Sequence, residues 1–167
     1  MSRTADDQRA AAHDATVDTR IGSAWKELRR GAAMSVLRDH LFGAGADALE
    51  PGQVDTLDLL VARDSWRMSE LAEALRVDPS TATRAVQRLV NAGMAERTAC
   101  TNDARVVKVS ATAAGRARQE SINDLRRETM TAMLASFDPY EREQFAEYMD
   151  RFVAALDEFV RELDNTP

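Results

Sequence analysis

The chain has very little cysteine and no long apolar run. Its 167 residues include one cysteine, Cys100, and no stretch approaches the roughly 20 apolar residues that a membrane-spanning helix needs. One cysteine excludes a disulfide within the chain and is typical of a reducing compartment. The N-terminal segment carries Asp6, Asp7 and Asp14 and no uninterrupted apolar stretch, which excludes a signal or transit peptide. We therefore expect a cytoplasmic protein that does not enter a membrane.

Residues that build catalytic and metal sites are also scarce. The two histidines, His13 and His40, lie far apart in the sequence and have no acidic or cysteine partner at metal-ligand spacing. The sequence contains no glycine-rich phosphate loop, no nucleophile elbow and no paired acid and base at helical spacing. We therefore expect no enzyme, no metal and no cofactor, and place His40 at a helix C-terminus, where positive charge is favoured.

Charge is distributed unevenly along the chain. The net charge is −6, which by itself argues against a nucleic-acid partner. Residues 79–110, however, hold five basic and two acidic residues, whereas residues 119–167 hold twelve acidic residues and five arginines. A local basic segment beside an acidic one orients a protein toward a polyanion such as DNA.

Apolar periodicity predicts a mainly helical chain with one β-hairpin. Residues 1–17 show no periodicity and are expected to form a disordered extension. A helix is expected over residues 18–38, before Gly43-Ala44-Gly45 stops it. The remaining expected elements are helices beginning at Pro51, Ser69 and Pro79, strands at 94–98 and 106–109, and long helices at 113–137 and 140–163.

The helix expected from Pro79 to Asn91 has two distinct faces. Asp78 before Pro79 is a strong helix start. At about 100° per residue, one face collects the apolar residues Ala82, Val86 and Leu89, and the other collects Ser80, Arg84, Gln87 and Asn91. Hydroxyl, amide and guanidinium groups are those that contact base edges and phosphates. The sequence therefore predicts a winged helix-turn-helix over residues 49–112.

Apolar residues also form a seam along the last predicted helix. They recur at spacings of four and three, as in a coiled coil: Phe145, Met149, Phe152, Leu156, Phe159 and Leu163. Exposed to water, this seam would be a large apolar patch, which a second copy of the chain would cover. We therefore predict a homodimer formed through a first dimerisation helix at residues 18–48 and C-terminal helices at residues 113–167.

The order and spacing of several short motifs resemble the MarR family of bacterial transcription regulators. The resemblance covers residues 49–115 and rests on Glu70-Leu71-Ala72, Val77-Asp78-Pro79-Ser80-Thr81-Ala82-Thr83-Arg84, Asn91-Ala92-Gly93-Met94-Ala95-Glu96-Arg97, Asp103-Ala104-Arg105 and Thr112-Ala113-Ala114-Gly115. It implies a dimeric regulator, more often a repressor than an activator. Such a regulator binds a pseudo-palindromic operator and releases it when a small molecule binds or a thiol is oxidised.

The resemblance also implies a set of DNA-binding residues. The major-groove candidates are Ser80, Thr81, Thr83, Arg84, Gln87 and Arg88. Arg105, at the hairpin tip, would enter the adjacent minor groove. Asp103 completes this set, and we expect it to hold the hairpin by pairing with an arginine such as Arg97. For Arg97 itself, a surface ion pair and a DNA contact are both open.

Effector sensing has three candidate residues. Members of the family place ligands between the dimerisation helices and the DNA-binding body, where Trp25 and Trp66 could contact a small aromatic or phenolic effector. The alternative is that both tryptophans belong to the core. Cys100 lacks the second cysteine that thiol sensors usually use as a resolving partner, and we interpret it as incidental.

One alternative from another class of function stays open. A winged helix can also serve as a protein–protein interaction module without DNA binding, and the acidic total charge slightly favours this.

Overall fold

The computed structural model describes residues 2–45, 48–100 and 103–164, and gives the backbone alone for 2–13, 100, 103–106 and 164. The chain divides into two compact units, residues 1–122 and 123–167. Each is described by itself below.

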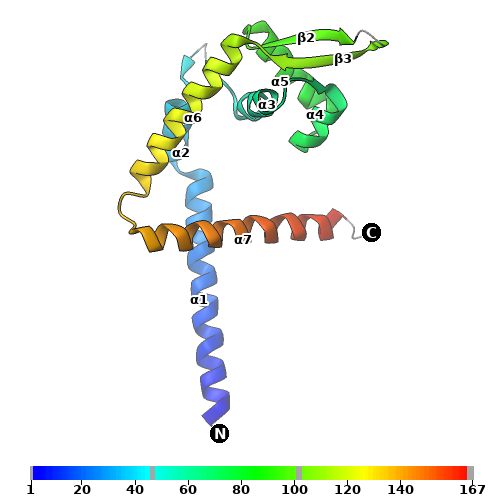
Figure 1. Cartoon of the computed structure of the whole chain (residues 1–167). Helices are drawn as coiled ribbons and strands as arrows, with labels where there is room; N and C mark the ends of the chain where they lie inside the picture. Colours follow the sequence, from blue (N-terminus) through cyan, green and yellow to red (C-terminus); the bar gives the residue numbers. More distant parts are fainter. Residues whose placement is uncertain (1, 46–47, 101–102, 165–167) are drawn as a thin grey trace. The chain divides into compact units, whose positions relative to one another are not determined.

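The first unit begins with two helices separated by a glycine. Helix α1 runs from Ser2 to Arg30 and α2 from Ala32 to Phe42 (Figure 1). Between them Gly31 is extended, at φ −63° and ψ 139°, and a Cβ there would lie 2.8 Å from the Glu27 carbonyl oxygen. The single helix expected over residues 18–38 is thus wrong, because a close backbone approach at Gly31 ends the first helix.

Helix α1 also begins earlier than the sequence predicted. It includes residues 2–17, which were expected to be disordered because they lack apolar periodicity. This segment is rich in alanine and contains no proline or glycine, so its intrinsic propensity favours a helix without an apolar face. His40 lies in the last turn of α2, as predicted.

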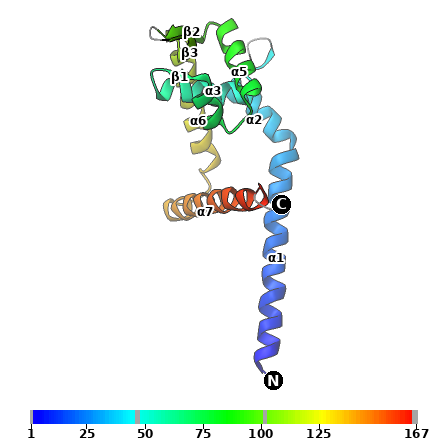
Figure 2. The same cartoon turned by 90° about the vertical axis from the view of Figure 1, so that its right-hand side faces the viewer.

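The DNA-binding body expected from the sequence forms around three helices and a small sheet. Helices α3 (Pro51–Ala62), α4 (Met68–Leu75) and α5 (Pro79–Asn91) gather beside the hairpin of β2 (Ala95–Cys100) and β3 (Asp103–Ala111) (Figures 1 and 2). We call this hairpin the wing. A third strand, β1 (Trp66–Arg67), pairs with β3, so the antiparallel sheet has the order β1-β3-β2. Two residues are too short for a periodic pattern, and the sequence did not predict β1.

The core of the first unit lies where these elements meet. Its buried apolar residues come from α3, α4, α5, the wing and α6 (Ala113–Met133), and from Leu49 just before α3: Leu49, Val54, Leu57, Leu60, Leu71, Val86, Leu89, Ala95, Val109, Ala111 and Ile122. Of the apolar face predicted for α5, Val86 and Leu89 belong to this cluster, and Ala82 is also buried. Burial stabilises the fold by about 25 cal/mol for each Å² of apolar surface removed from water. This cluster therefore holds α5 with its polar face outward.

Helix α6 (Ala113–Met133) starts in contact with this body. The Thr112 hydroxyl donates to the Gly93 carbonyl at 2.7 Å and accepts from the Gly115 backbone N–H at 3.1 Å. Further along, Arg118 Nη2 donates to the Phe42 carbonyl at 2.9 Å, and Gln119 Nε2 donates to Asp58 Oδ1 at 3.1 Å. The first turns of α6 are therefore fixed to α2, α3 and the end of α5.

The second unit contains the end of α6 and helix α7 (Pro139–Asp164). Helix α6 ends at Met133, four residues before the predicted end at Phe137, because residues 134–137 form a turn. Asp138 caps α7: its Oδ1 accepts from the Glu141 N–H, and Glu141 Oε2 accepts from the Asp138 N–H, both at 2.9 Å. Within the described part of the chain, no helix is long and apolar enough to cross a membrane.

Candidate nucleic-acid interface

The start of α5 is fixed by a carboxylate and two hydroxyls. Asp78 Oδ1 accepts from the Thr81 N–H at 3.0 Å and from the Ser80 hydroxyl at 2.5 Å, and Oδ2 accepts from the Thr81 hydroxyl at 2.5 Å. These donors, the Ser80 hydroxyl first, hold the pKa of Asp78 well below its usual range. Asp78 is the predicted N-cap, and it stays ionised at neutral pH.

The hydroxyls of the predicted DNA-binding set already donate within the protein. Those of Ser80 and Thr81 donate to Asp78, and that of Thr83 donates to the Pro79 carbonyl at 2.7 Å. A hydroxyl also carries two acceptor lone pairs. In this arrangement the hydroxyls of Ser80, Thr81 and Thr83 can accept hydrogen bonds from a nucleic acid but do not donate to it. Helical periodicity alone does not predict this.

Arg84 and Arg88 are the cationic groups on the exposed side of α5. Both side chains are exposed, one turn apart, and opposite the buried residues Ala82 and Val86. Within the described part of the chain, neither guanidinium forms a hydrogen bond or an ion pair. Guanidinium groups bind phosphate oxygens and the O6/N7 edge of guanine in bidentate fashion. These two residues are therefore ready to bind an anion without breaking an existing contact.

Gln87 and Asn91 on the same helix are connected to the wing. Arg97 Nη1, on β2, donates to Gln87 Oε1 at 2.8 Å, and Gln87 Nε2 donates to Asn91 Oδ1 at 2.8 Å. The sequence predicted an arginine such as Arg97 as the partner of Asp103, whose side chain is outside the described residues. It could not predict the Gln87 contact, because it depends on how α5 packs against β2.

The turn from α5 to β2 sets this packing. Gly93 has a φ of +70°, the left-handed conformation that the sequence predicted for the helix end. Its N–H donates to the Val90 carbonyl at 3.0 Å, while the Met94 N–H donates to the Leu89 carbonyl at 2.9 Å. This pair of bonds is a Schellman motif. It turns the chain sharply, so that β2 leads back along α5.

The wing lies partly outside the described residues. Strands β2 and β3 pair in register from Ala95↔Ala111 to Ala99↔Val107, with an irregularity between Ala99 and Cys100. Thr101 and Asn102 at its tip are outside the described residues, as are the side chains of Cys100, Asp103 and Arg105. The predicted roles of Asp103 and Arg105 at the DNA, the pairing of Asp103 with an arginine, and the interpretation of Cys100 as incidental therefore stay predictions.

The two tryptophans of the predicted effector site have different environments. Trp66 packs partly buried against the core, and its indole N–H donates to the Leu59 carbonyl at 2.8 Å. The Arg63 guanidinium carbon lies 4.6 Å from the Trp66 ring centroid. Since its N–H is already used, Trp66 has no free donor for an aromatic carboxylate. Trp25, on α1, is 51% exposed.

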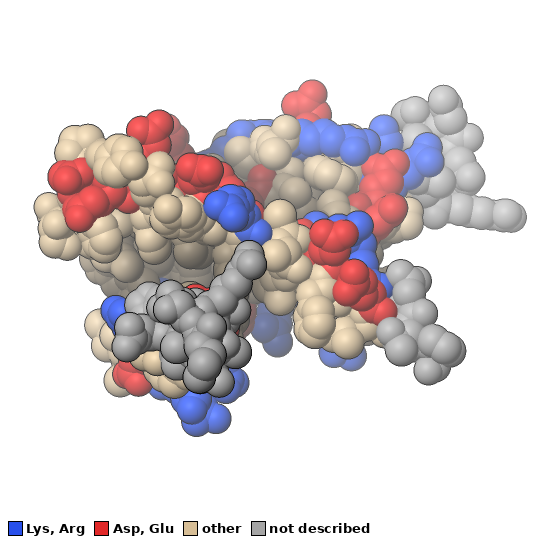
Figure 3. Space-filling model, turned by 90° about the horizontal axis from the view of Figure 1, so that it is seen from below, with Lys and Arg blue, Asp and Glu red and all other residues tan. Residues whose placement is uncertain are grey.

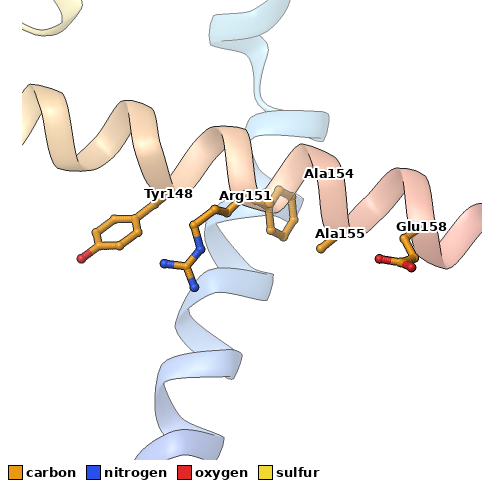
Figure 4. Close-up of a pocket in the computed structure, with 6 residues that line it drawn as sticks. Tyr148, Arg151, Ala154, Ala155 and Glu158 are labelled. Carbon is orange, nitrogen blue, oxygen red and sulfur yellow. The ribbon is translucent and has the colours of Figure 1, made fainter.

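A shallow hollow on α7 is not an enclosed ligand site. Its labelled lining residues all come from α7, and Figure 4 shows them along one helix. A hollow bordered by a single helix leaves a small molecule open to water on its other sides, whereas ligand sites bury most of their ligand. Among the described residues, no group of three or more His, Cys, Asp or Glu could hold a metal ion.

Acidic and basic side chains are mixed on the surface. In the view of Figure 3, Asp and Glu side chains lie beside Lys and Arg side chains. The local groups that would attract a polyanion, such as Arg84 and Arg88, lie in residues 79–110, whose net charge is +3.

Comparison with known proteins agrees with this geometry. Residues 49–107 match the model of the MarR family. A probable transcriptional regulator from Pseudomonas aeruginosa is 26% identical to this chain, with a TM-score of 0.64, over 81% of this chain and 98% of that one. None of the curated proteins matches the chain.

Two further solved structures resemble this chain in fold. A MarR family transcription regulator is 18% identical, with a TM-score of 0.76, over 94% of this chain and 99% of that one. Streptococcus pneumoniae FabT in complex with DNA is 19% identical, with a TM-score of 0.68, over 87% of this chain and 98% of that one. They confirm the predicted fold class, a mainly helical winged helix-turn-helix.

Proposed function

We propose that this chain, a MarR-family protein by its domain at residues 49–107 and by its fold, binds an inverted-repeat operator as a homodimer and regulates transcription, as a repressor. Members of this family are transcriptional regulators, not enzymes. In the proposed complex, α5 of each subunit lies in the major groove and the wing follows the adjacent minor groove.

The observation that carries the proposal is the placement of Arg84 and Arg88. The core buries one face of α5, the Asp78 cap and the Gly93 turn fix its two ends, and both guanidinium groups remain exposed on the other side. A rigid helix with exposed arginines and acceptor hydroxyls suits both phosphate and base contacts. FabT, which shares the fold, was solved with DNA bound.

The proposed homodimer is supported by the exposed apolar face of α7. Phe145, Met149, Phe152 and Leu156 are each 43–45% exposed, and Phe159 and Leu163 are 57% and 56% exposed. These residues are the predicted seam, and they lie on one side of the helix. An apolar stripe of this length is typical of a surface that another protein covers.

Release by a small aromatic or phenolic effector is the third part of the proposal. Trp25, half exposed on α1, stays its candidate contact residue. Quenching of tryptophan fluorescence by salicylate, compared between the wild type and Trp25→Phe, tests this role. Loss of the saturable signal in the variant supports it, and an unchanged signal contradicts it.

Salt-dependent binding to duplex DNA tests the function. Fluorescence anisotropy of a labelled random-sequence duplex, measured between 50 and 200 mM salt, gives the slope of log K against log [salt]. We expect the affinity to fall steeply, by a slope of about −0.9 for each phosphate neutralised. The control variant Arg116→Ala removes one positive charge from α6, outside α5 and the wing, and should keep the slope.

Absence of binding at the lowest salt would contradict the proposal. It would favour the alternative of a winged helix that binds another protein and no DNA.

A further inference from the structure

The hydrogen bonds among Arg97, Gln87 and Asn91 form a short chain that connects the wing to α5. Arg97 Nη1 donates to Gln87 Oε1, and Gln87 Nε2 donates to Asn91 Oδ1, each at 2.8 Å. All three side chains are exposed. The packing of the core therefore does not depend on these contacts. What they restrict is the orientation of the Gln87 amide.

The position of Arg97 follows from the strand. Side chains alternate between the two faces of a strand, so Arg97 shares a face with Ala95, which is buried in the core beside Leu89 of α5. The residues on either side of Arg97 in the strand, Glu96 and Thr98, lie on the other face. The strand geometry thus directs Arg97, among these residues, toward α5.

Arg97 can hold the Gln87 amide in only one orientation. A guanidinium has donors and no acceptor, so the amide oxygen, not the NH₂ group, must face Arg97. Asn91, one helical turn further on, then takes the NH₂ group. A flipped amide would place NH₂ against the guanidinium and lose the bond to Arg97.

Amide orientation matters for base recognition. A glutamine binds adenine when its oxygen accepts from N6 and its nitrogen donates to N7. The order of the amide oxygen and nitrogen along the groove therefore decides which strand of the base pair must carry the adenine. An amide that is free to flip accepts more than one base pair, whereas a fixed amide discriminates between them.

We infer that Arg97 is a positioning residue for Gln87: from the wing it fixes which way the Gln87 amide faces, and thereby which base pair is preferred beneath Gln87 in the major groove. This inference rests on the proposed DNA-binding function. It assigns Arg97 a role in specificity that is distinct from an ion pair with Asp103 and from a phosphate contact.

Selection from a random duplex library tests the inference with three substitutions. Arg97→Ala removes the donor, and Arg97→Lys keeps a side-chain donor. The third substitution, Gln87→Ala, is made alone and together with Arg97→Ala. We expect Arg97→Ala to broaden the preference at one base pair of each half-site, by several-fold, given that a bidentate contact discriminates by about 5- to 150-fold. Arg97→Lys should restore the preference, and Arg97→Ala should change nothing further in the Gln87→Ala background.

The side-chain NH₂ resonances of Gln87 in the free protein give a second readout. They should move in Arg97→Ala and stay close to the wild type in Arg97→Lys, while the backbone amide spectrum of the core is unchanged. This measurement needs no DNA and also shows that the variants are folded.

The possible results separate the inference from the function on which it rests. A uniform loss of affinity at all base pairs, equal in the Gln87→Ala background, would make Arg97 a phosphate contact and overturn the inference alone. An unchanged selection profile for Arg97→Ala would also overturn it alone. If the wild type enriches no sequence and shows no salt-dependent binding, the proposed function falls, and the inference falls with it.

Discussion

At the scale of single residues, Arg84 and Arg88 differ from the other polar groups of α5. Ser80, Thr81, Thr83 and Gln87 already donate to protein acceptors, whereas the two guanidinium groups have no partner within the described part of the chain. Binding DNA through an arginine on this face therefore breaks no hydrogen bond of the free protein. The main loss on binding is side-chain entropy and hydration.

Arg84→Ala should weaken operator binding by about 1–3 kcal/mol and relax the preference at one base pair, because a bidentate arginine–guanine contact carries that discrimination. Competition between the selected operator and single-base variants measures both effects. Arg116→Ala is the matched control and should bind as the wild type does. A loss that is equal for every sequence would show that Arg84 contacts phosphate only.

Gly115 is a residue whose small size the fold requires. A Cβ at this position would lie 2.0 Å from the Met94 carbonyl oxygen, a backbone atom. Gly115→Ala must therefore move α6 away from the α5–β2 turn, and we expect it to lower the free energy of unfolding by about 1–3 kcal/mol. Denaturant unfolding measures the change.

The control for this substitution is Gly52→Ala in α3, where a Cβ would meet nothing within 4 Å. It should be neutral or stabilising, because alanine is the better helix former. Equal stability of Gly115→Ala and the wild type would contradict the close approach of α6.

At the scale of elements, the sequence predicted α5 to the residue and other elements less well. Asp78-Pro79 marked its start and Gly93 its end, because a cap and a left-handed turn require particular residue types. The break at Gly31 and strand β1 depend instead on close backbone approach and on pairing with β3. Such tertiary contacts leave no periodic pattern in the sequence.

The candidate site, too, has features that the sequence predicted and features that depend on tertiary contacts. Periodicity placed Arg84 and Gln87 on the exposed side of α5, and the family resemblance added Arg88; the structure has all three exposed. The hydrogen bonds of the hydroxyls and the contact between Gln87 and Arg97 could not be predicted, because they depend on rotamers and on how β2 returns along α5.

The cap of α5 makes its start sensitive to acid. Hydrogen bonds from Ser80 and Thr81 lower the pKa of Asp78 in the folded protein, below the value of about 3.9 for an unfolded Asp. Its contribution to stability is therefore fully present above about pH 4 and is lost as the pH falls toward the folded-state pKa.

Asp78→Asn should lower Tm at pH 7, and the difference from the wild type should narrow below about pH 4. Thermal unfolding followed by circular dichroism between pH 2.5 and 7 measures this. Asp150→Asn, which removes a carboxylate from the middle of α7, is the control and should show no such narrowing. A difference that is constant across this range would contradict a charge-dependent cap.

At the scale of the whole molecule, the apolar face of α7 is the proposed dimer interface. The seam residues repeat at helical spacing, and Leu156 at its centre is 45% exposed. Ala154 lies on the opposite side of the same helix, about 200° away from Leu156 at 100° per residue. The two positions therefore allow the same substitution to be placed on and off the proposed interface.

Leu156→Asp should convert the proposed dimer into a species near the mass of one chain, 18.5 kDa, because it buries an unpaired charge in the interface. Ala154→Asp should remain dimeric. Light scattering after size exclusion measures both masses. A wild type that is monomeric, or a Leu156→Asp variant that stays dimeric, would contradict a dimer formed through this face.

The measurement that tests the central claim most directly is selection of bound duplexes from a random library by the wild-type protein. Two α5 helices related by two-fold symmetry must contact two half-sites, so we predict an inverted repeat with half-site centres about 10 base pairs apart. Enrichment of a single asymmetric site, or of no sequence, would contradict a dimeric DNA-binding regulator.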